Sequence, residues 1–303
     1  MVVGSFNVDV TCFAPKLPRH GETVSGSFVQ MSAGGKGFNQ AAAASRSGGN
    51  VKMVARIGKD ELTQMAHDCF KKFHVSEKYV REVEGKNTGS AFIEVDETNG
   101  ENRIIVVKGA NGALTDKDVY EAEEDFKDCD IIITQLETEI ETVKAAAELA
   151  EKFGKQIILN PAPCKELPPE ILRKVDFFTP NETEAEFYSG VHIENEEDAK
   201  RAAEKIMQLG VKNVIITLGK KGAYYKTADE DGLVPSITVK AVDTTGAGDA
   251  FNGALAVAIS EGKDIKSAIE YATVYAAVSV TRKGACESMP EREEAEDFMM
   301  RFR

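Results

Sequence analysis

The stretch AVDTTGAGDA, residues 241–250, joins two segments whose hydrophobic patterns differ. The residues before it, SITVKAV (236–242), alternate between apolar and polar side chains as a strand does. The residues after it, AFNGALAVAISEG (250–262), are mostly apolar and favour a helix. We therefore predict a strand-to-helix turn at Gly246 and Gly248, with Asp249 in the first turn of the helix.

This turn has the composition of an anion site. The first backbone N–H groups of a helix have no partner inside the helix, and glycine lets a ligand approach them closely. Phosphate is an anion that such helix starts bind readily. A carboxylate at position 249 would repel bound phosphate, so its presence favours a reaction in which Asp249 handles a proton while a phosphoryl group is transferred.

Outward from this turn, short β-rich runs alternate with helical stretches along most of the chain. The runs at 131–133 and 214–216 are apolar throughout, which is typical of parallel strands covered on both faces. The alternation predicts an α/β fold with a doubly wound, mostly parallel sheet flanked by helices. In such folds, ligands bind outside the carboxyl ends of the strands.

Two segments interrupt the alternation, because 21–35 and 88–109 resemble strands without helices between them. The second has the pattern of a hairpin around ETNGEN (97–102). We expect a small β-sheet lid formed by 13–33 and 88–108, beside a core of 1–12, 34–87 and 109–303. Extra edge strands on the main sheet are the alternative.

Composition narrows the possible partners. The 303 residues are 42% apolar and carry a net charge of −13, with no tract rich in Lys and Arg. An acidic chain of this kind is a poor match for nucleic acid or an anionic membrane. The five cysteines form no C-x-x-C pair, the four histidines show no zinc pattern, and the chain begins with a strand-like segment and not a signal peptide. We expect a cytoplasmic protein with reduced thiols.

Two common nucleotide motifs are missing from the sequence. No stretch fits the P-loop pattern G-x-x-x-x-G-K-[ST]. The dinucleotide pattern G-x-G-x-x-G also fails, because Gln40 and Phe251 occupy its third glycine position in the two candidate stretches.

Other polar residues follow strands or open helices. Asn7 and Asp9 lie two apart on a strand and so share a face, where they would suit vicinal hydroxyls or form an ordinary polar strand end. Candidate hydroxyl ligands in SAGGKGFNQA (32–41) are Gly34, Gly35, Lys36, Gly37 and Asn39.

A third group follows the strand-like run at 175–178. Asn181 and Glu184 share one side of a helix start, where Glu184 would hold water on magnesium or simply cap the helix. Thr217 and the glycines of TLGKKG (217–222) would line a nucleotide.

Taken in order, these segments resemble the ribokinase branch of the PfkB carbohydrate kinase family. The matching motifs extend from residue 4 to about 286: GSFNVD, GGKGFNQA, TGSAFI, QLE, NPAP, TPNETEAE, ITLGKKG, DTTGAGDAFNGAL and VTRKGA. The resemblance implies ATP-dependent, magnesium-dependent phosphorylation of D-ribose at its 5-hydroxyl. It also implies that Asp249 is the general base and that the N–H groups of Gly246, Ala247 and Gly248 form the anion hole.

The resemblance implies further site residues. Those for the sugar are Asn7, Asp9, Gly35, Lys36, Gly37, Asn39, Glu137 and Asp249. Those for the nucleotide are Asn181, Thr217, Leu218, Gly219, Gly222, Gly248 and Thr273, with Glu184 near magnesium through water. An activating potassium ion would be held by Asp243, Thr245, Val280, Lys283 and Ala285, with Ser288 as a side-chain ligand. The lid would pair with a second lid to form a homodimer.

Two residues depart from the family pattern: Phe38 lies in the sugar loop, and Thr273 lies where relatives place Asn or His near the adenine. Phe38 would either pack away from the sugar or narrow its pocket. Two alternatives stay open, namely a sibling kinase acting on fructose, deoxyribose or a nucleoside, and a catalytically silent sugar- or nucleotide-binding regulator.

Overall fold

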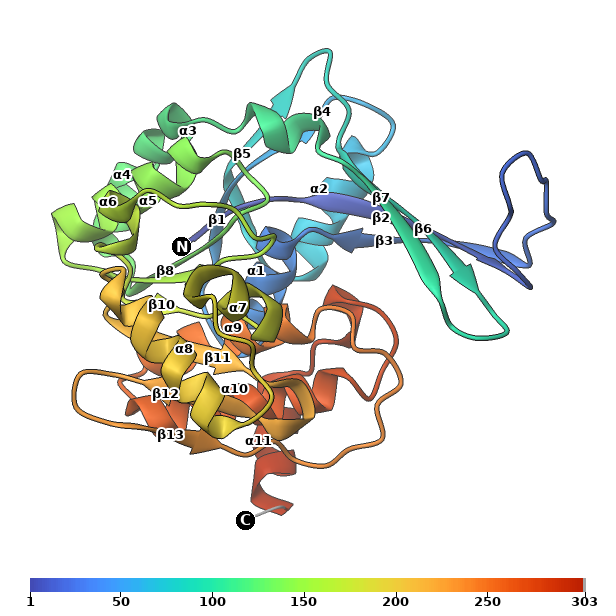
Figure 1. The fold of residues 1–303 in the computed structure, drawn as a ribbon. Helices are drawn as coiled ribbons and strands as arrows, with labels where there is room; N and C mark the ends of the chain where they lie inside the picture. The colour runs from blue at the N-terminus through green and yellow to red at the C-terminus, as the bar shows by residue number, and fades with distance from the viewer. Residues whose placement is uncertain (302–303) are drawn as a thin grey trace.

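The computed structural model describes residues 1–301, which form a large sheet with helices on both faces and a separate small sheet that projects from it (Figure 1). The large sheet has nine strands in the order β13-β12-β11-β10-β9-β8-β1-β4-β5. All neighbours from β5 to β11 are parallel, and β12 and β13 add an antiparallel edge. The strands are β1 (Val2–Val3), β4 (Lys52–Gly58), β5 (Ser76–Val83), β8 (Ile131–Gln135), β9 (Gln156–Asn160), β10 (Phe177–Phe178), β11 (Asn213–Thr217), β12 (Ala223–Lys226) and β13 (Asp231–Val234).

Helices cover both faces of this sheet, as the apolar strands predict. Ile131 and Ile133 face one core cluster, whereas Ile132 between them faces another. Helices on the first face are α1 (Lys36–Arg46), α2 (Thr63–Lys72), α9 (Ala247–Ser260), α10 (Ile265–Ser279) and α11 (Arg292–Arg301). Those on the other are α3 (Asp116–Glu121), α4 (Glu123–Asp128), α5 (Ile140–Phe153), α6 (Pro169–Leu172), α7 (Glu182–Ser189) and α8 (Glu196–Gln208).

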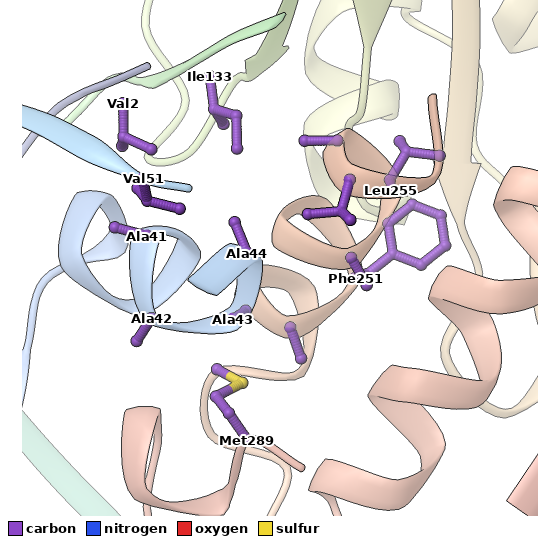
Figure 2. Close-up of a cluster of buried hydrophobic side chains, with 14 of the residues drawn as sticks. Val2, Ala41, Ala42, Ala43, Ala44, Val51, Ile133, Phe251, Leu255 and Met289 are labelled. Carbon is purple, nitrogen blue, oxygen red and sulfur yellow. The ribbon is translucent and has the colours of Figure 1, made fainter. Parts of the chain in front are cut away.

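The helices that begin at the predicted sugar loop and at the predicted anion hole, α1 and α9, pack closely against each other. Small side chains make this possible, because Ala41, Ala43 and Ala44 of α1 are buried in the same cluster as Phe251 and Leu255 (Figure 2). A Cβ atom on Gly253 would come within 2.5 Å of the Ala43 Cβ. The contact therefore fixes the start of α9, with Asp249, relative to the glycine-rich start of α1.

The small sheet contains β2 (Asn7–Ala14), β3 (Phe28–Gly34), β6 (Gly89–Asp96) and β7 (Asn102–Val107), in the order β3-β2-β6-β7. Its strands extend away from the body of the molecule (Figure 1). The boundary that we placed at residue 13 is too late, because β2 runs without a break from Asn7 and pairs along its length with β3 and β6. Residues 7–12 therefore belong to the small sheet and not to the large one.

One segment near the predicted anion site differs from the sequence prediction. Residues 236–242 form no strand, and helix α10 ends at Ser279, so that residues 280–285 form a loop beside them. The N–H groups of Val242 and Asp243 donate to the carbonyl of Val280 at 2.7 and 3.2 Å. These backbone groups therefore pair with the end of α10, and the 236–242 segment runs along a pocket instead of joining a sheet.

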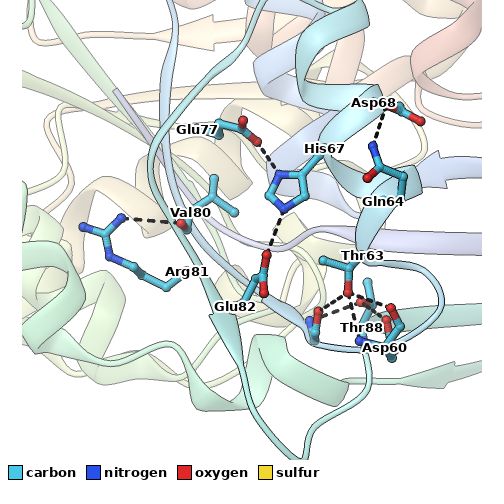
Figure 3. A network of polar contacts seen from close by, with 11 residues as sticks. Asp60, Thr63, Gln64, His67, Asp68, Glu77, Val80, Arg81, Glu82 and Thr88 are labelled. Carbon is cyan, nitrogen blue, oxygen red and sulfur yellow. Dashed lines mark hydrogen bonds and ion pairs between the residues drawn. The ribbon is translucent and has the colours of Figure 1, made fainter.

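Hydrogen bonds also fix the base of the small sheet. The carboxylate of Asp60 accepts bonds from the backbone N–H and the hydroxyl of Thr88, at 2.6 and 2.9 Å, just before β6 begins (Figure 3). On the same side of the molecule, His67 of α2 lies between Glu77 and Glu82 of the edge strand β5. The hydrogen bond with Glu77 raises the pKa of His67.

No helix between residues 1 and 301 has the length and apolar character needed to cross a membrane.

Candidate active site

Asp249 lies in the first turn of α9, as predicted, and its carboxylate is held by two side-chain amides. The helix follows Gly246, whose φ of 75° is the left-handed conformation that glycine adopts without strain. Asn39 Nδ2 donates to one carboxylate oxygen of Asp249 at 3.1 Å, and Gln40 Nε2 donates to the other at 2.9 Å. Asp249 is only 5% exposed, so these bonds set the orientation of a nearly buried carboxylate.

Gln40 is itself held by amides from two strand ends. Its Nε2 also donates to Asn160 Oδ1 at 3.2 Å, and its Oε1 accepts from Gln135 Nε2 at 2.7 Å. Our list of site residues lacked all three amides, although each lies in a motif that we had singled out: GGKGFNQA, QLE and NPAP. Gln135 and Asn160 lie at the carboxyl ends of strands, and Gln40 follows Asn39. These positions were the available sequence signal for a role in the site.

Asp9 lies near Asp249, on the face of β2 that also carries Asn7. Burial, followed by the negative charges of Glu137 and Asp249, raises the pKa of the Asp9 carboxyl to about 6. Gly34, opposite Asn7 in the sheet, is needed beside this carboxylate, because a Cβ there would lie 2.3 Å from an Asp9 oxygen. The structure thus gathers three carboxylates around one point.

Glu137 receives hydrogen bonds from the glycine-rich start of α1 and from Ser5. Its Oε2 accepts from the Lys36 N–H at 2.8 Å and from the Ser5 hydroxyl at 2.5 Å, and the same hydroxyl accepts from the Gly37 N–H at 3.2 Å. A Cβ on Gly37 would come within 2.5 Å of the Ser5 nitrogen. The glycines therefore let this loop lie directly against the strand end that carries the sugar-binding candidates. Gly35 has the same role, because its Cβ would lie 2.8 Å from the Asn7 nitrogen.

A pocket of about 690 Å³ opens at Gly248, next to Asp249 in the chain, and none of the residues that line it belongs to the small sheet. Six of the seven predicted nucleotide residues line it, namely Asn181, Thr217, Gly219, Gly222, Gly248 and Thr273. The seventh, Leu218, does not: its side chain is packed in the apolar core, and its N–H bonds to the Gly222 carbonyl. The Thr273 hydroxyl is buried and has no partner among residues 1–301, so it is available to a ligand.

Lys36 lies between the two sets of residues. It lines the pocket, and its backbone N–H contacts Glu137 on the sugar side. The negative charge of Asp249 raises the pKa of the Lys36 ammonium, with Glu137 and Glu184 adding to the effect against burial. A permanent positive charge is thus placed between the predicted base and the pocket, where it would neutralise phosphate.

Glu184 has the geometry of the capped helix that we considered as an alternative. Its two oxygens accept from the Asn181 N–H at 2.9 Å and the Asn181 amide at 3.0 Å, while Asn181 Oδ1 accepts from the Glu184 N–H. Burial raises the pKa of Glu184. Among residues 1–301, no group of three or more His, Cys, Asp or Glu side chains is arranged to bind a metal ion directly.

The loops predicted to enclose potassium do lie together. The side chain of Asp243 joins them, accepting from the Gly284 N–H at 2.9 Å and from Thr245 through its N–H and hydroxyl. The Val280 carbonyl already accepts two N–H groups, and the Ala285 carbonyl accepts the N–H and the hydroxyl of Ser288. Protein donors thus occupy two of the predicted carbonyl ligands.

Phe38 takes the first of the two positions that we considered. It is completely buried, with its ring 5.0 Å from that of Phe6, 5.0 Å from that of Phe70 and 5.7 Å from that of Phe73. These aromatic contacts place the side chain in the core beneath the sugar loop, so it does not narrow the pocket.

Comparison with known proteins agrees with this geometry. The family model described as pfkB family carbohydrate kinase matches residues 1–292. The chain belongs to the pfkB family of carbohydrate kinases. A ribokinase of Haemophilus influenzae is 38% identical over 98% of this chain and 97% of its own length. A deoxyribokinase of Salmonella typhi is also 38% identical, over 98% of this chain and 97% of its own length.

The family's structures extend the comparison to the fold. The structure of Arabidopsis thaliana ribokinase complexed with ribose and ATP matches with a TM-score of 0.92 at 33% identity, covering 98% of this chain and 97% of that one. The resemblance that we drew from nine short motifs is therefore confirmed over nearly the whole chain. In this pfkB kinase, Asp249 and the turn before it occupy the meeting point of the sugar-binding candidates and the pocket.

Proposed function

We propose that this pfkB kinase transfers the γ-phosphoryl group of ATP to the 5-hydroxyl of D-ribose. The observation that carries the proposal is the position of Asp249, a fixed carboxylate between the hydroxyl-binding candidates Asn7 and Asp9 and a pocket of nucleotide size. The Arabidopsis relative that binds ribose and ATP has the same fold.

The proposed chemistry needs one proton acceptor and a site for developing negative charge. Asp249 takes the proton of the sugar hydroxyl as that oxygen attacks the γ-phosphorus, and the bond from phosphorus to the ADP oxygen breaks. The N–H groups at the start of α9 and the Lys36 ammonium stabilise the charge on the transferring group. Magnesium bound with ATP would add Lewis-acid charge neutralisation, and Glu184 would hold its waters from the edge of the pocket.

A sugar panel tests the proposal. ADP release should be fastest with D-ribose when the enzyme is compared on ribose, 2-deoxyribose, fructose and nucleosides at equal concentration. Because a deoxyribokinase is as similar to this chain as a ribokinase is, 2-deoxyribose is the decisive comparison. A higher kcat/KM for deoxyribose would assign the protein to that sibling activity, and no ADP release with any sugar would favour the silent regulator.

An ATP-dependent enzyme of this kind would work in the cytoplasm.

We also propose an activating potassium ion at the 243–288 loops, because carbonyl oxygens suit a large, weakly hydrated cation. The carbonyls of Asp243, Thr245 and Lys283 remain as ligands after the hydrogen bonds described above. The ion would fix the turn that precedes the anion hole without touching the substrate. Replacing sodium by potassium at constant ionic strength should raise kcat several-fold, and equal rates in sodium, potassium and a bulky organic cation would contradict the proposal.

The small sheet supports a homodimer. Its register places Met31, Phe92 and Ile105 on the face opposite Asp9, and the three side chains are 47%, 48% and 67% exposed. Large apolar side chains gathered in this way on a projecting sheet commonly mark a protein interface. We propose that two copies bring these faces together while the other face covers the sugar.

A charge on this face should prevent dimer formation. Sedimentation at micromolar concentration should show a dimer for the unmodified protein and a monomer for Ile105→Glu, because pairing would bury the new carboxylate without a partner. Met300→Glu is the matched control, since Met300 is 69% exposed on α11, outside the small sheet, and this variant should stay dimeric. A monomeric unmodified protein would refute the proposal.

A further inference from the structure

Residues 4–6, between β1 and β2, form no strand, and a side chain from a distant part of the sequence binds the backbone there. Asn111, in the short helical turn Gly109–Ala113 (η1), pairs with the backbone of Phe6 as a neighbouring strand would. Its Oδ1 accepts from the Phe6 N–H at 3.0 Å, and its Nδ2 donates to the Phe6 carbonyl at 2.9 Å. Asn111 is 2% exposed, so no solvent competes for these bonds.

This pairing fixes which end of the Asn111 amide is nitrogen. An amide turned by 180° would set its oxygen against the Phe6 carbonyl and its NH₂ group against the Phe6 N–H, losing both bonds. The second hydrogen of Asn111 Nδ2 points to Asn7 Oδ1, 2.8 Å away. Only an oxygen can accept there, so the amide of Asn7 is fixed as well, with its NH₂ group directed away from Asn111.

The fixed orientation matters because Asn7 shares one face of β2 with Asp9. Asp9 offers carboxylate oxygens, which accept hydrogen bonds, and Asn7 offers N–H groups, which donate them. A hydroxyl group is both donor and acceptor, so a pair of adjacent hydroxyls is matched by this acceptor and this donor side by side. With its amide reversed, Asn7 would present a second acceptor and lose that complementarity.

The same contact lies where the chain enters and leaves the small sheet. Gly89, the first residue of β6, pairs with Asn7, and a Cβ there would lie 2.1 Å from Asn111 Nδ2 and 2.3 Å from Asn7 Oδ1. Asn111 follows the last strand of the sheet by four residues. The contact between the two amides therefore depends on the connections that lead into β2 and β6 and out of β7.

We propose that Asn111 is a positioning residue that sets the donor face of Asn7 toward the sugar. The inference rests on the proposed function, in which Asn7 binds sugar hydroxyls. Asn111 touches no substrate and acts on the sugar only through Asn7.

A double-mutant cycle on Asn7→Ala and Asn111→Ala tests this. Asn111→Ala alone should raise the KM for ribose at least about tenfold, the size expected for a lost buried hydrogen bond and a misdirected amide, with the KM for ATP changed less than about twofold. In the Asn7→Ala background, the same substitution should change the ribose KM by less than about twofold, because the residue it positions is absent. If Asn111→Ala raised the ribose KM by the same factor with and without Asn7, the proposal would be overturned, because a general loss of structure acts whether or not Asn7 is present.

A second variant covers the case in which Asn111→Ala does not fold. Asn111→Asp keeps the acceptor for the Phe6 N–H and removes the donor to both the Phe6 carbonyl and Asn7, so Asn7 should turn its NH₂ group toward position 111. The ribose KM should again rise about tenfold only when Asn7 is present. An unchanged ribose KM would overturn the proposal.

Ser90→Ala serves as the control. This hydroxyl is buried at the base of the small sheet and donates to the Thr88 carbonyl, so the variant should keep the ribose KM of the unmodified protein. An unmodified protein that phosphorylates no sugar would refute the proposed function. An active protein whose ribose KM does not respond to Asn111 would refute only the positioning role.

Discussion

Asp249→Asn should lower kcat at least about a hundredfold, the usual contribution of a positioned general base, while ribose and ATP still bind. Asparagine has the same shape and can still receive a hydrogen bond from Asn39 or Gln40, so the start of α9 should keep its geometry. It cannot take the proton of the attacking hydroxyl. Steady-state kinetics with both substrates, together with calorimetric binding of ribose, would separate the lost chemical step from lost binding.

Asp264→Asn is the matched control for this substitution. Asp264 lies at the N-terminus of the neighbouring helix α10, where its side chain accepts from the Ser267 N–H, and asparagine caps helices equally well. The kcat of the Asp264→Asn variant should stay within about twofold of that of the unmodified enzyme, as expected for a surface substitution. Near-normal turnover by Asp249→Asn would remove Asp249 from the mechanism.

Asp9→Ala should raise the KM for ribose about a hundredfold and leave the KM for ATP nearly unchanged. Hydrogen bonds to a charged group contribute about 1.5–3 kcal/mol each, and about 2.7 kcal/mol corresponds to a hundredfold change. Asp9 lies on the small-sheet side of Asp249 and outside the lining of the nucleotide pocket, so the two substrates should respond differently. If the KM for ATP changed most, the sugar would not bind at β2.

The ionisation of Asp9 predicts how ribose binding depends on pH. Its pKa is raised to about 6, so the carboxylate protonates as the pH falls through that value and loses acceptor capacity. The KM for ribose should therefore rise below about pH 6. In Asp9→Asn, which cannot titrate, this part of the pH dependence should disappear, and an unchanged profile would show that another group is responsible.

The raised pKa of Asp9 also predicts how the free energy of unfolding depends on pH. A carboxyl whose pKa is higher in the folded state stabilises the fold at low pH, and this contribution is lost as the pH rises from about 4 to about 6. Above pH 6, the charged Asp9 therefore makes unfolding easier. Asp9→Asn should be more stable than the unmodified protein at pH 8 by about 3 kcal/mol, and the difference should vanish near pH 4.

The sequence predicted the architecture because its signals were local. Alternating apolar runs and helical stretches identified the parallel sheet, and the glycines beside Asp249 identified the helix start. Local patterns failed where long-range pairing decides the structure. The 236–242 segment alternates like a strand, but its end pairs with the carbonyl of Val280 and not with a sheet.

The candidate site shows the same limit. The residues with charges or special backbone geometry, such as Asp9, Gly37 and Asp249, were visible as departures from ordinary helix and strand composition. Asn111 was not, because a buried amide reveals its role only through its partners, which here lie 104 and 105 positions away in the chain. Leu218 lies outside the pocket lining for a related reason: its neighbours Thr217 and Gly219 line the pocket, but its own side chain packs in the core.

One strand, β2, belongs to the projecting sheet and also carries Asn7 and Asp9. Any swing of that sheet would carry Asn7 and Asp9 with it, away from Asp249 and Glu137 in the body of the enzyme. Without sugar, three neighbouring carboxylates repel one another and favour that separation. A sugar whose hydroxyls link these groups would then assemble its own binding site on arrival, and the reverse motion would open the site when the product leaves.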